Sequence, residues 1–481
     1  GFGNHANAHN IANGFGWGPD GWLYGTHGVT NWSLLGKPRT PKEKRRRFEG
    51  GVWRYHPVRH EWESFAVGTT NPWGIDWNDY GHAFISNCVN PHLFHVVQGA
   101  FYPPGRNRPT GRYAYERIAT IADHLHFSNS KVIRAGIGTP EEDKVGGGHA
   151  HCGTMVYLGD NWPEKYRGQV FMNNIHGRRV NMDVLTRNDS GYIASHAPDV
   201  VRSADPWFVG VSLAYGPDGG VYVSDFSDTG ECHHTRNTRK HTGRIFKITY
   251  GKPKPWKGDI GKLKIEELAE LQLHDNDWFV RHARRVMHER LDFTHKTWSP
   301  VSPDPNKNYA AWRERRSGWF GDVDEVLKKQ LNENKSTPKR LRALWALYVT
   351  DGVDSDHLMA LFDDRDEHVR SWAIQLLMND VQLTKAGVAM LTELAMKDKS
   401  PLVRLYLASA AQRVPIELRL PLLKALLAHG EDVDDPNLPL MYWYATEPVV
   451  AADAKAGVQL LVACKIPKVR QFITRRMASQ Q

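Results

Sequence analysis

The chain is 481 residues long, with a formal net charge of +9 and 41% hydrophobic residues. This length exceeds what one hydrophobic core supports, so it predicts two or three domains, and no apolar stretch is long enough for a transmembrane helix. The four cysteines are too few and too scattered for a disulfide framework or a zinc knuckle. The basic run Lys42–Arg47 lies in an aromatic, glycine-rich context that is not typical of a nucleic-acid-binding module, so no nucleic-acid partner is expected.

The composition changes near residue 250. The residues before this point are rich in Gly, Trp, His and Asn, and 17 of the 24 histidines lie there. After the segment Lys252–Pro255, the residues Leu, Ala, Glu, Lys and Arg recur at helical spacing. The change predicts a first domain over residues 1–250, a linker over residues 251–262 and a helical domain over residues 263–481.

A repeated turn motif organises the first domain. Gly-Pro-Asp-Gly followed by a strand-forming sequence occurs at Gly18–Tyr24 and again at Gly216–Tyr222, with weaker copies at Gly81–Phe84 and Gly168–Phe171. Proline fixes φ in such a turn, glycine supplies a positive φ, and the apolar and aromatic residues that follow favour strands. Four turn-and-strand units at irregular intervals predict the blades of an all-β propeller with inserted loops; a β-sandwich is the alternative.

Polar residues follow each of these strands at equivalent places. Equivalent positions of successive propeller blades converge around the central axis, so the shared register predicts a polar pocket at one mouth of the channel. The residues concerned are Thr26, His27, Ser86, Asn87, Asn173, Asn174, His176, Ser224, Asp225 and Asp228.

Two further segments carry candidate chemistry. His9, beside Asn10 and just before the first hairpin, could act as a general base, because the pKa of an unperturbed histidine lies near neutrality; a loop histidine held by hydrogen bonds is the alternative. His149 and His151 would face the same way on a strand, either as metal ligands or as pocket residues that bind a substrate or cofactor.

The run from Asp225 to His234 is the densest group of titratable residues. It packs three carboxylates and two histidines, including Asp228 and His233, into ten residues. Calcium or a transition metal could use some of them, although the spacing matches no EF-hand loop. We therefore expect this run to line a pocket.

The second half contains a Val-Arg motif at the start of successive amphipathic helices. The motif occurs at Val280, Val369 and Val403, with a fainter copy at Val469. The valine is expected to be buried against the neighbouring repeat, and a preceding acidic or polar residue to cap the helix. The 34-residue interval from Val369 to Val403 is close to the HEAT range. The pattern predicts an all-α HEAT/ARM-type solenoid of antiparallel helix pairs over residues 261–480, which docks a partner or braces the propeller.

Several of these motifs resemble a known family. The run Asn161–Phe171 and the turn Asn71–Gly74 look like a blade and a turn of the soluble quinoprotein glucose and sorbosone dehydrogenases, and Gly216–Gly219 with Gly243–Ile248 resembles their last blade. Still closer is the membrane-bound dehydrogenase-like family, in which such a propeller precedes HEAT repeats and often a cytochrome c-type haem domain. The resemblance covers nearly the whole chain, but the sequence has no haem attachment motif.

The resemblance implies a six-bladed propeller, exported to the periplasm or associated with a membrane, that oxidises a sugar or an alcohol with the quinone cofactor PQQ. By position His9 resembles the catalytic base, and Asn71 the asparagine that lies at the cofactor. Two departures count against PQQ. Thr70 stands where the dehydrogenases carry an arginine, and the paired arginines that grip the quinone carboxylates are missing around residues 208–212.

The sequence therefore predicts an exported oxidoreductase of a sugar or alcohol, with a cytochrome or another protein as a partner on the helical array. The rival hypotheses are a non-catalytic propeller that binds a carbohydrate or a metal, and a metal-dependent carbohydrate hydrolase or lyase. Because four blades are visible, we expect the missing blades of a six-bladed ring to precede Gly1. The predicted site consists of His9 as the catalytic residue and, for substrate or cofactor binding, Asn10, His27, Asn71, Asn87, His149, His151, Asn174, His176, Asp225, Asp228 and His233.

Overall fold

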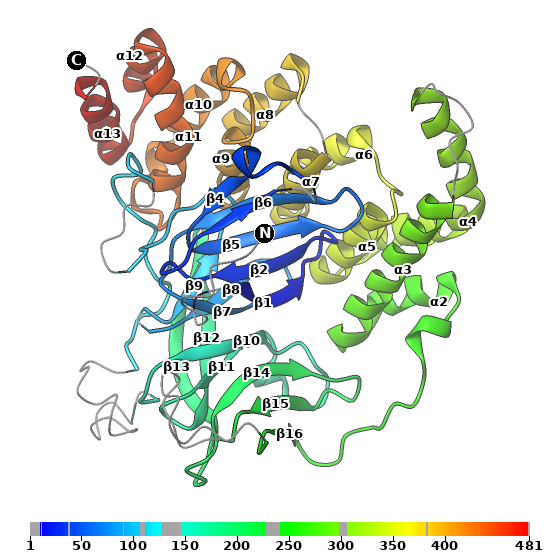
Figure 1. The fold of residues 1–481 in the computed structure, drawn as a ribbon. Coiled ribbons are helices and arrows are strands. Elements are labelled where there is room, and N and C mark those ends of the chain that lie inside the picture. The colour runs from blue at the N-terminus through cyan, green and yellow to red at the C-terminus, as the bar shows by residue number, and fades with distance from the viewer. Residues whose placement is uncertain are drawn as a thin grey trace.

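The computed structural model describes residues 10, 12–36, 39–89, 91–105, 111–126, 144, 146–227, 241–297, 305–380 and 383–479. The N-terminal region is rich in sheets and the C-terminal region is helical, and the two pack against each other (Figure 1). The last strand of the sheet region ends at Ile248, and the first α-helix after it begins at Ile265.

Four antiparallel sheets follow one another along the chain. Within each sheet the strands are hydrogen-bonded in chain order, which is the topology of a propeller blade, and one short hairpin is inserted between β2 and β5. The strands are, in the first sheet, β1 (Ala12–Trp17), β2 (Leu23–His27), β5 (Gly51–His56) and β6 (Glu61–Val67); in the inserted hairpin, β3 (Ser33–Leu35) and β4 (Arg46–Phe48); in the second sheet, β7 (Pro72–Trp77), β8 (Ala83–Asn87) and β9 (Leu93–Val96); in the third, β10 (His151–Val156), β11 (Val170–Asn174), β12 (Arg179–Asn188) and β13 (Gly191–Arg202); and in the fourth, β14 (Gly210–Tyr215), β15 (Val221–Asp225) and β16 (Arg244–Ile248).

The repeated turn motif forms the first hairpin of each sheet. In the first sheet, Gly21 has a φ of 79° and Asp20 Oδ1 accepts a hydrogen bond from the backbone N–H of Trp22. The fourth sheet repeats this turn, with Gly219 at a φ of 70° and Asp218 Oδ1 accepting from the N–H of Gly220. The predicted turn-and-strand units are therefore confirmed.

The first strands of the four sheets, β1, β7, β10 and β14, lie side by side. Each of them carries a β-bulge. Gly14, Gly74 and Gly153 lie at three of these bulges with positive φ, and a Cβ atom added to Gly74 would lie only 2.4 Å from the backbone nitrogen of Thr154. Glycine is thus required where neighbouring sheets approach most closely. Among the described strands we find no closed ring of sheets.

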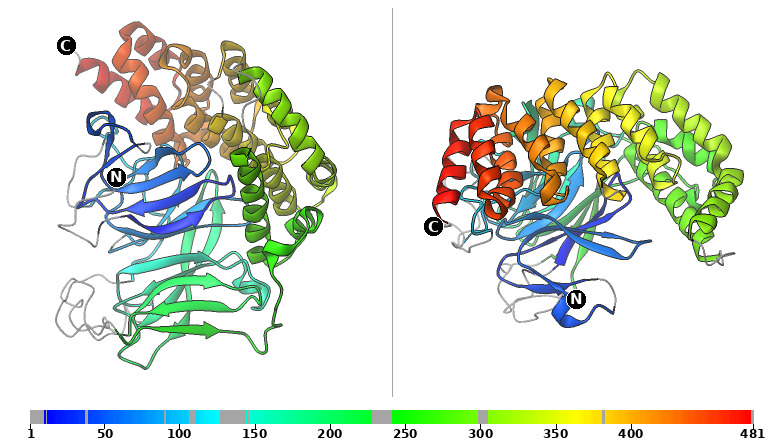
Figure 2. Two further views of the ribbon diagram at one scale, coloured as in Figure 1. Left: turned by 45° about the vertical axis from the view of Figure 1, so that its right-hand side comes forward. Right: turned by 90° about the horizontal axis from the view of Figure 1, so that it is seen from above.

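The helices form a curved array that wraps around one side of the sheets (Figure 2). The helices α3, α5, α7, α9, α11 and α13 pack one against the next in a row. Val280, Val369 and Val403 are fully buried, as predicted. Within the described part of the chain, no helix combines the length and the apolar character needed to cross a membrane. The helices are α2 (Ile265–Glu270), α3 (Asp277–Thr297), α4 (Pro305–Glu333), α5 (Thr337–Val349), α6 (Ser355–Ala360), α7 (Glu367–Asp380), α8 (Lys385–Lys397), α9 (Pro401–Ala411), α10 (Leu420–Leu427), α11 (Leu438–Ala452), α12 (Ala454–Ala463) and α13 (Pro467–Ala478).

The helices dock on the hairpins that join the first and second strands of the sheets. Trp372 Nε1 of α7 donates to the carbonyl of Tyr80 at 2.8 Å in the second sheet, and the Asn276 amide before α3 donates to the carbonyl of Gly216 at 3.1 Å in the fourth. The ends of the second strands, which carry the predicted polar residues, are therefore remote from these hairpins. The helices therefore dock at one end of the sheets, and the candidate site lies at the other end.

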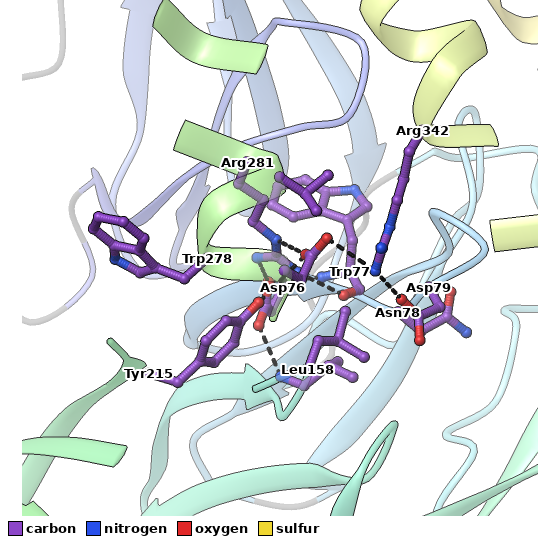
Figure 3. Close-up of polar contacts among 12 residues, drawn as sticks. Asp76, Trp77, Asn78, Asp79, Leu158, Tyr215, Trp278, Arg281 and Arg342 are labelled. Carbon is purple, nitrogen blue, oxygen red and sulfur yellow. Dashed lines mark hydrogen bonds and ion pairs between the residues drawn. The ribbon is translucent and has the colours of Figure 1, made fainter. Parts of the chain in front are cut away.

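Buried ion pairs reinforce the docking (Figure 3). Arg281 of α3 donates to Asp76 Oδ1 at 2.5 Å and to the carbonyl of Trp77, and Arg342 of α5 donates to Asp79 Oδ1 at 2.8 Å. Burial disfavours the ionised form of Asp277, but Arg281 and Arg342 outweigh it and lower the pKa of this carboxyl group to about 2. The two regions are thus joined by charged groups as well as by apolar packing.

Candidate metal centre

The predicted polar residues occupy one register position in all four sheets. His27, Asn87, Asn174 and Asp225 each end the second strand of a sheet. Each pairs with the first residue of the neighbouring inner strand. The shared register predicted from the sequence is therefore present in the strand pairing.

These side chains tie loops to the ends of the strands. Asn87 Oδ1 accepts from the backbone N–H of Asn71 at 2.8 Å, and Asp225 Oδ1 accepts from that of Val209 at 2.7 Å. Asn174 Oδ1 accepts from the N–H of Gly177, while its Nδ2 donates to the carbonyl of Gly146. Their polar atoms thus serve local structure, as in an Asx turn.

The other predicted residues near the first two sheets also make local bonds. His27 Nε2 lies 2.9 Å from Ser33 Oγ, and burial lowers the pKa of this histidine. Asn10 Oδ1 accepts from the N–H of Thr30, and Asn71 Oδ1 accepts from Trp73 Nε1. His9, Asp228 and His233 lie outside the described residues.

The spacing of His149 and His151 predicted that both would lie on one face of a strand. The structure shows that they do not. β10 begins only at His151, and Ala150 has a φ of 63°, which turns the chain between the two histidines. His149 packs against His176 with ring centroids 4.0 Å apart, whereas the ring of His151 lies 4.8 Å from that of His92. His151 is therefore the predicted residue that reaches a larger histidine cluster.

Four residues of this cluster are arranged as metal ligands. One ligand atom from each of His92, His124, His126 and Asp183 lies within 4.8 Å of all the others. His92 Nε2 is 3.0 Å from Asp183 Oδ2, and His124 Nε2 is 3.5 Å from Asp183 Oδ1. His124 Nε2 and His126 Nε2 are 3.2 Å apart. Imidazole nitrogens and a carboxylate oxygen at these separations converge on one point, as metal ligands do.

Three separate segments of the chain bring these ligands together. His92 immediately precedes β9, Asp183 lies in β12, and His124 and His126 lie in the irregular segment that follows β9. His92, His126 and Asp183 are fully buried, and His124 is 11% exposed. The site is thus enclosed by the second and third sheets rather than spread over the surface.

The surroundings keep the imidazole of one ligand, His126, in the neutral form that binds metals. Burial and the neighbouring histidines hold the pKa values of His126 and His151 well below their usual range, and burial lowers the pKa of His196. His151 Nε2 lies 3.2 Å from Asn181 Oδ1. Nδ1 of His92 and of His151 has no hydrogen-bond partner within the described part of the chain.

The sequence contained one signal for this centre that our prediction did not use. His124 and His126 form a His-x-His pair, the same pattern that drew attention to His149 and His151. Asp183, in contrast, is an ordinary strand residue in the sequence, and only the packing of the third sheet against the second places it beside His92.

The described residues do not fit PQQ. The segment Phe208–Ser212 contains no basic residue. The nearby guanidinium of Arg244 is already engaged by Asp205 and Asp225. A tricarboxylate cofactor needs several cationic or N–H donors that are free to bind it. The disagreement noted in the sequence therefore persists in the structure.

The chain is similar to several proteins of known structure. Solved structures that match include a glucose dehydrogenase-type oxidoreductase from Thermus thermophilus (19% identity, TM-score 0.31, 51% of this chain and 68% of that one) and two further glucose dehydrogenases (14% and 16% identity, TM-scores 0.33 and 0.30). These two cover 51% and 49% of this chain, which spans 65% and 63% of their lengths. Similarities at these TM-scores do not bear on function. No curated protein matches the chain. Residues 1–252, more than half of the chain, match a family described as a domain of unknown function, and the chain therefore belongs to the DUF7133 family.

Proposed function

We propose that the protein binds a divalent transition-metal ion through His92, His124, His126 and Asp183. The observation that supports the proposal best is the Asp183 carboxylate, which is fully buried and whose oxygens face the nitrogens of His92 and His124. A buried carboxylate is costly unless it is paired or coordinates a metal ion. The low pKa of His126 keeps this neighbouring imidazole uncharged, so a metal ion would supply the missing positive charge.

The donor set favours a transition metal over calcium. Imidazole nitrogens suit zinc, iron, copper and nickel, whereas calcium takes about six to eight oxygen ligands. Three imidazoles and one carboxylate fill the coordination shell of a tetrahedral zinc ion. An ion that takes five or six ligands would keep positions for water or for a substrate. The identity of the metal therefore decides between a structural and a catalytic centre.

Elemental analysis of the purified full-length protein tests the proposal. We expect about one transition-metal ion per chain and loss of this ion in the Asp183→Asn and His126→Ala variants. The His60→Ala variant is the control, because His60 is an exposed histidine of the first sheet. A wild-type protein that binds no zinc, iron, manganese, cobalt, nickel or copper after metal loading would contradict the proposal, as would retention of the ion in both variants.

The reaction and its setting are further proposals. Oxidation of a sugar or alcohol, an exported location, a six-bladed ring and a HEAT-type array that docks a protein partner all come from the family resemblance. The metal centre is compatible with this oxidation, with the rival hydrolase or lyase activity and with a purely binding role. Assays of the metal-loaded protein with sugars and alcohols plus an artificial electron acceptor, and in parallel with glycosides, separate the three. Turnover in neither assay would favour the binding role.

A further inference from the structure

The segment that carries two of the ligands is fastened to β13. The N–H of Asp123 donates to the carbonyl of Ala194 at 3.1 Å, and the N–H of Ala194 donates to the carbonyl of Ile121 at 2.8 Å. Ala122 and Ala194 form an isolated parallel β-bridge. These bonds fix the backbone next to His124, although this segment belongs to no strand or helix. The edge of β13 therefore sets the position of the ligand segment.

The Asp123 side chain connects β13 with one of the ligands. Asp123 Oδ1 lies 2.9 Å from His124 Nδ1, and Asp123 Oδ2 accepts a hydrogen bond from Ser195 Oγ at 2.5 Å. Ser195 follows Ala194 in β13. Two consecutive residues of this strand therefore make the backbone and the side-chain contacts to the ligand segment. A neutral imidazole that donates from Nδ1 keeps its lone pair on Nε2. In His124, Nε2 is the atom that faces His126 and Asp183.

We propose that Asp123 is a positioning residue for the metal centre, and that Ser195 holds its carboxylate in place. Asp123 accepts the Nδ1–H of His124, selects the tautomer with a free Nε2 lone pair and orients the ring toward the ion, without touching the ion itself. Carboxylate groups behind histidine ligands act in this way in metal sites. The inference rests on the proposed metal binding, and it adds two residues that the ligand set alone does not contain.

The test uses the metal-free full-length protein and Co²⁺ as the probe, with the visible absorbance of bound Co²⁺ and competition by Zn²⁺ as readouts. We expect Asp123→Ala to weaken Co²⁺ binding about 10–100-fold and to alter the Co²⁺ spectrum, because the His124 ring loses its orientation. Asp123→Asn, which keeps an oxygen acceptor, and Ser195→Ala should show smaller losses. Asp205→Ala is the matched control, since Asp205 is a partly exposed carboxylate paired with Arg244 in the fourth sheet.

The outcomes distinguish this inference from the metal proposal. The Asp123 side chain is 47% exposed, so its removal should leave the folded state intact, and a thermal unfolding curve checks this. If the wild-type protein binds no Co²⁺, the metal proposal itself is wrong. If the wild-type protein binds Co²⁺ and both Asp123 variants bind it with the same affinity and spectrum, Asp123 is not a positioning residue. A loss of affinity in Asp205→Ala equal to that in Asp123→Ala would also overturn the assignment.

Discussion

Single glycines control how closely the sheets approach one another. The bulge of β7 brings the Gly74 backbone against Thr154 of β10, and the bulge of β1 brings Gly14 against Gly74 in turn. Polar side chains at the C-terminal ends of the second strands hold the neighbouring loops. The two kinds of residue recur in several sheets because each sheet solves the same packing problem. Their repetition in the sequence therefore indicates the fold of the sheets and does not by itself indicate a catalytic site.

Substitution of Gly74 tests the close approach. In Gly74→Ala the new Cβ would lie 2.4 Å from the backbone nitrogen of Thr154, and the residue would keep a φ of 105°. Overpacking together with backbone strain should lower the free energy of unfolding by about 2–4 kcal/mol. Gly168→Ala is the control, because Gly168 also has a positive φ, 78°, but no atom lies within 4 Å of its added Cβ. Equal losses in urea-induced unfolding of the two variants would show that crowding at Gly74 contributes nothing.

Titratable residues in the sequence located the candidate site only in part. Titratable residues near turns drew the sequence prediction to His9, His149, His151 and Asp225, and of these His151 lies beside the metal centre. Asp225 instead caps a loop and pairs with Arg244. The ligands come from three segments between residues 92 and 183. His92 meets Asp183 because the second sheet packs against the third, a long-range contact that local patterns do not encode.

At the scale of elements, the Val-Arg motif does two things in the helical array. The valine fills the core, and in two copies of the motif the arginine joins its helix to an aspartate further along the array. Arg370 Nε donates to Asp398 at 2.6 Å and Arg404 Nε donates to Asp432 at 2.8 Å, and Nη1 of each arginine donates to the backbone carbonyl six residues earlier. The sequence analysis predicted the burial of the valines from helical periodicity. It did not predict the ion pairs, because their partners lie 28 residues away in the next repeat.

Removal of one such arginine should be costly. In Arg404→Ala the Asp432 carboxylate would stay buried, and among the described residues only the Tyr442 hydroxyl would remain as a side-chain donor. An uncompensated buried carboxylate costs about 3–5 kcal/mol. The control is Lys397→Ala, which breaks an exposed ion pair with Asp363 and should cost less than about 1 kcal/mol. Chemical unfolding of both variants decides the matter. A loss below about 1 kcal/mol in Arg404→Ala would mean that the ion pair between Arg404 and Asp432 does not stabilise the array.

At the scale of the whole molecule, a chain of three histidines crosses from the sheets to the helices. His95 Nε2 of β9 lies 3.2 Å from His82 Nδ1, and His82 Nε2 lies 3.3 Å from His368 Nδ1 of α7. Contacts of this kind need one protonated and one unprotonated nitrogen, so the chain can exist with all three rings neutral. The rings are surrounded by Tyr80, Tyr192, Tyr406, Arg187, Asp366 and Glu367.

Burial keeps these histidines neutral. Burial and the charge of Arg187 lower the pKa of His95 to about 3, and burial lowers that of His368 to about 4 although Glu367 opposes the shift. Burial and the two neighbouring histidines hold the pKa of His82 well below its usual value. Because additional protons would place like charges beside Arg187 at the interface, docking of the two regions should depend on pH.

The interface should therefore weaken in mild acid. A histidine in the unfolded chain takes up a proton near pH 6.5, whereas the folded His368 does so only near pH 4. The stability from the neutral ring is complete above pH 6.5 and is lost as the pH falls toward the folded pKa, by about 2 kcal/mol per histidine between pH 7 and pH 5. Urea unfolding at these two pH values measures the loss, and His368→Gln should reduce it by about 2 kcal/mol. His357→Gln, at a half-exposed histidine of α6, is the control and should leave the loss unchanged. The histidines of the metal centre are the same in both variants and so cannot account for a difference between them. If His368→Gln and the wild-type protein lose the same stability between the two pH values, this chain of rings does not govern the acid sensitivity.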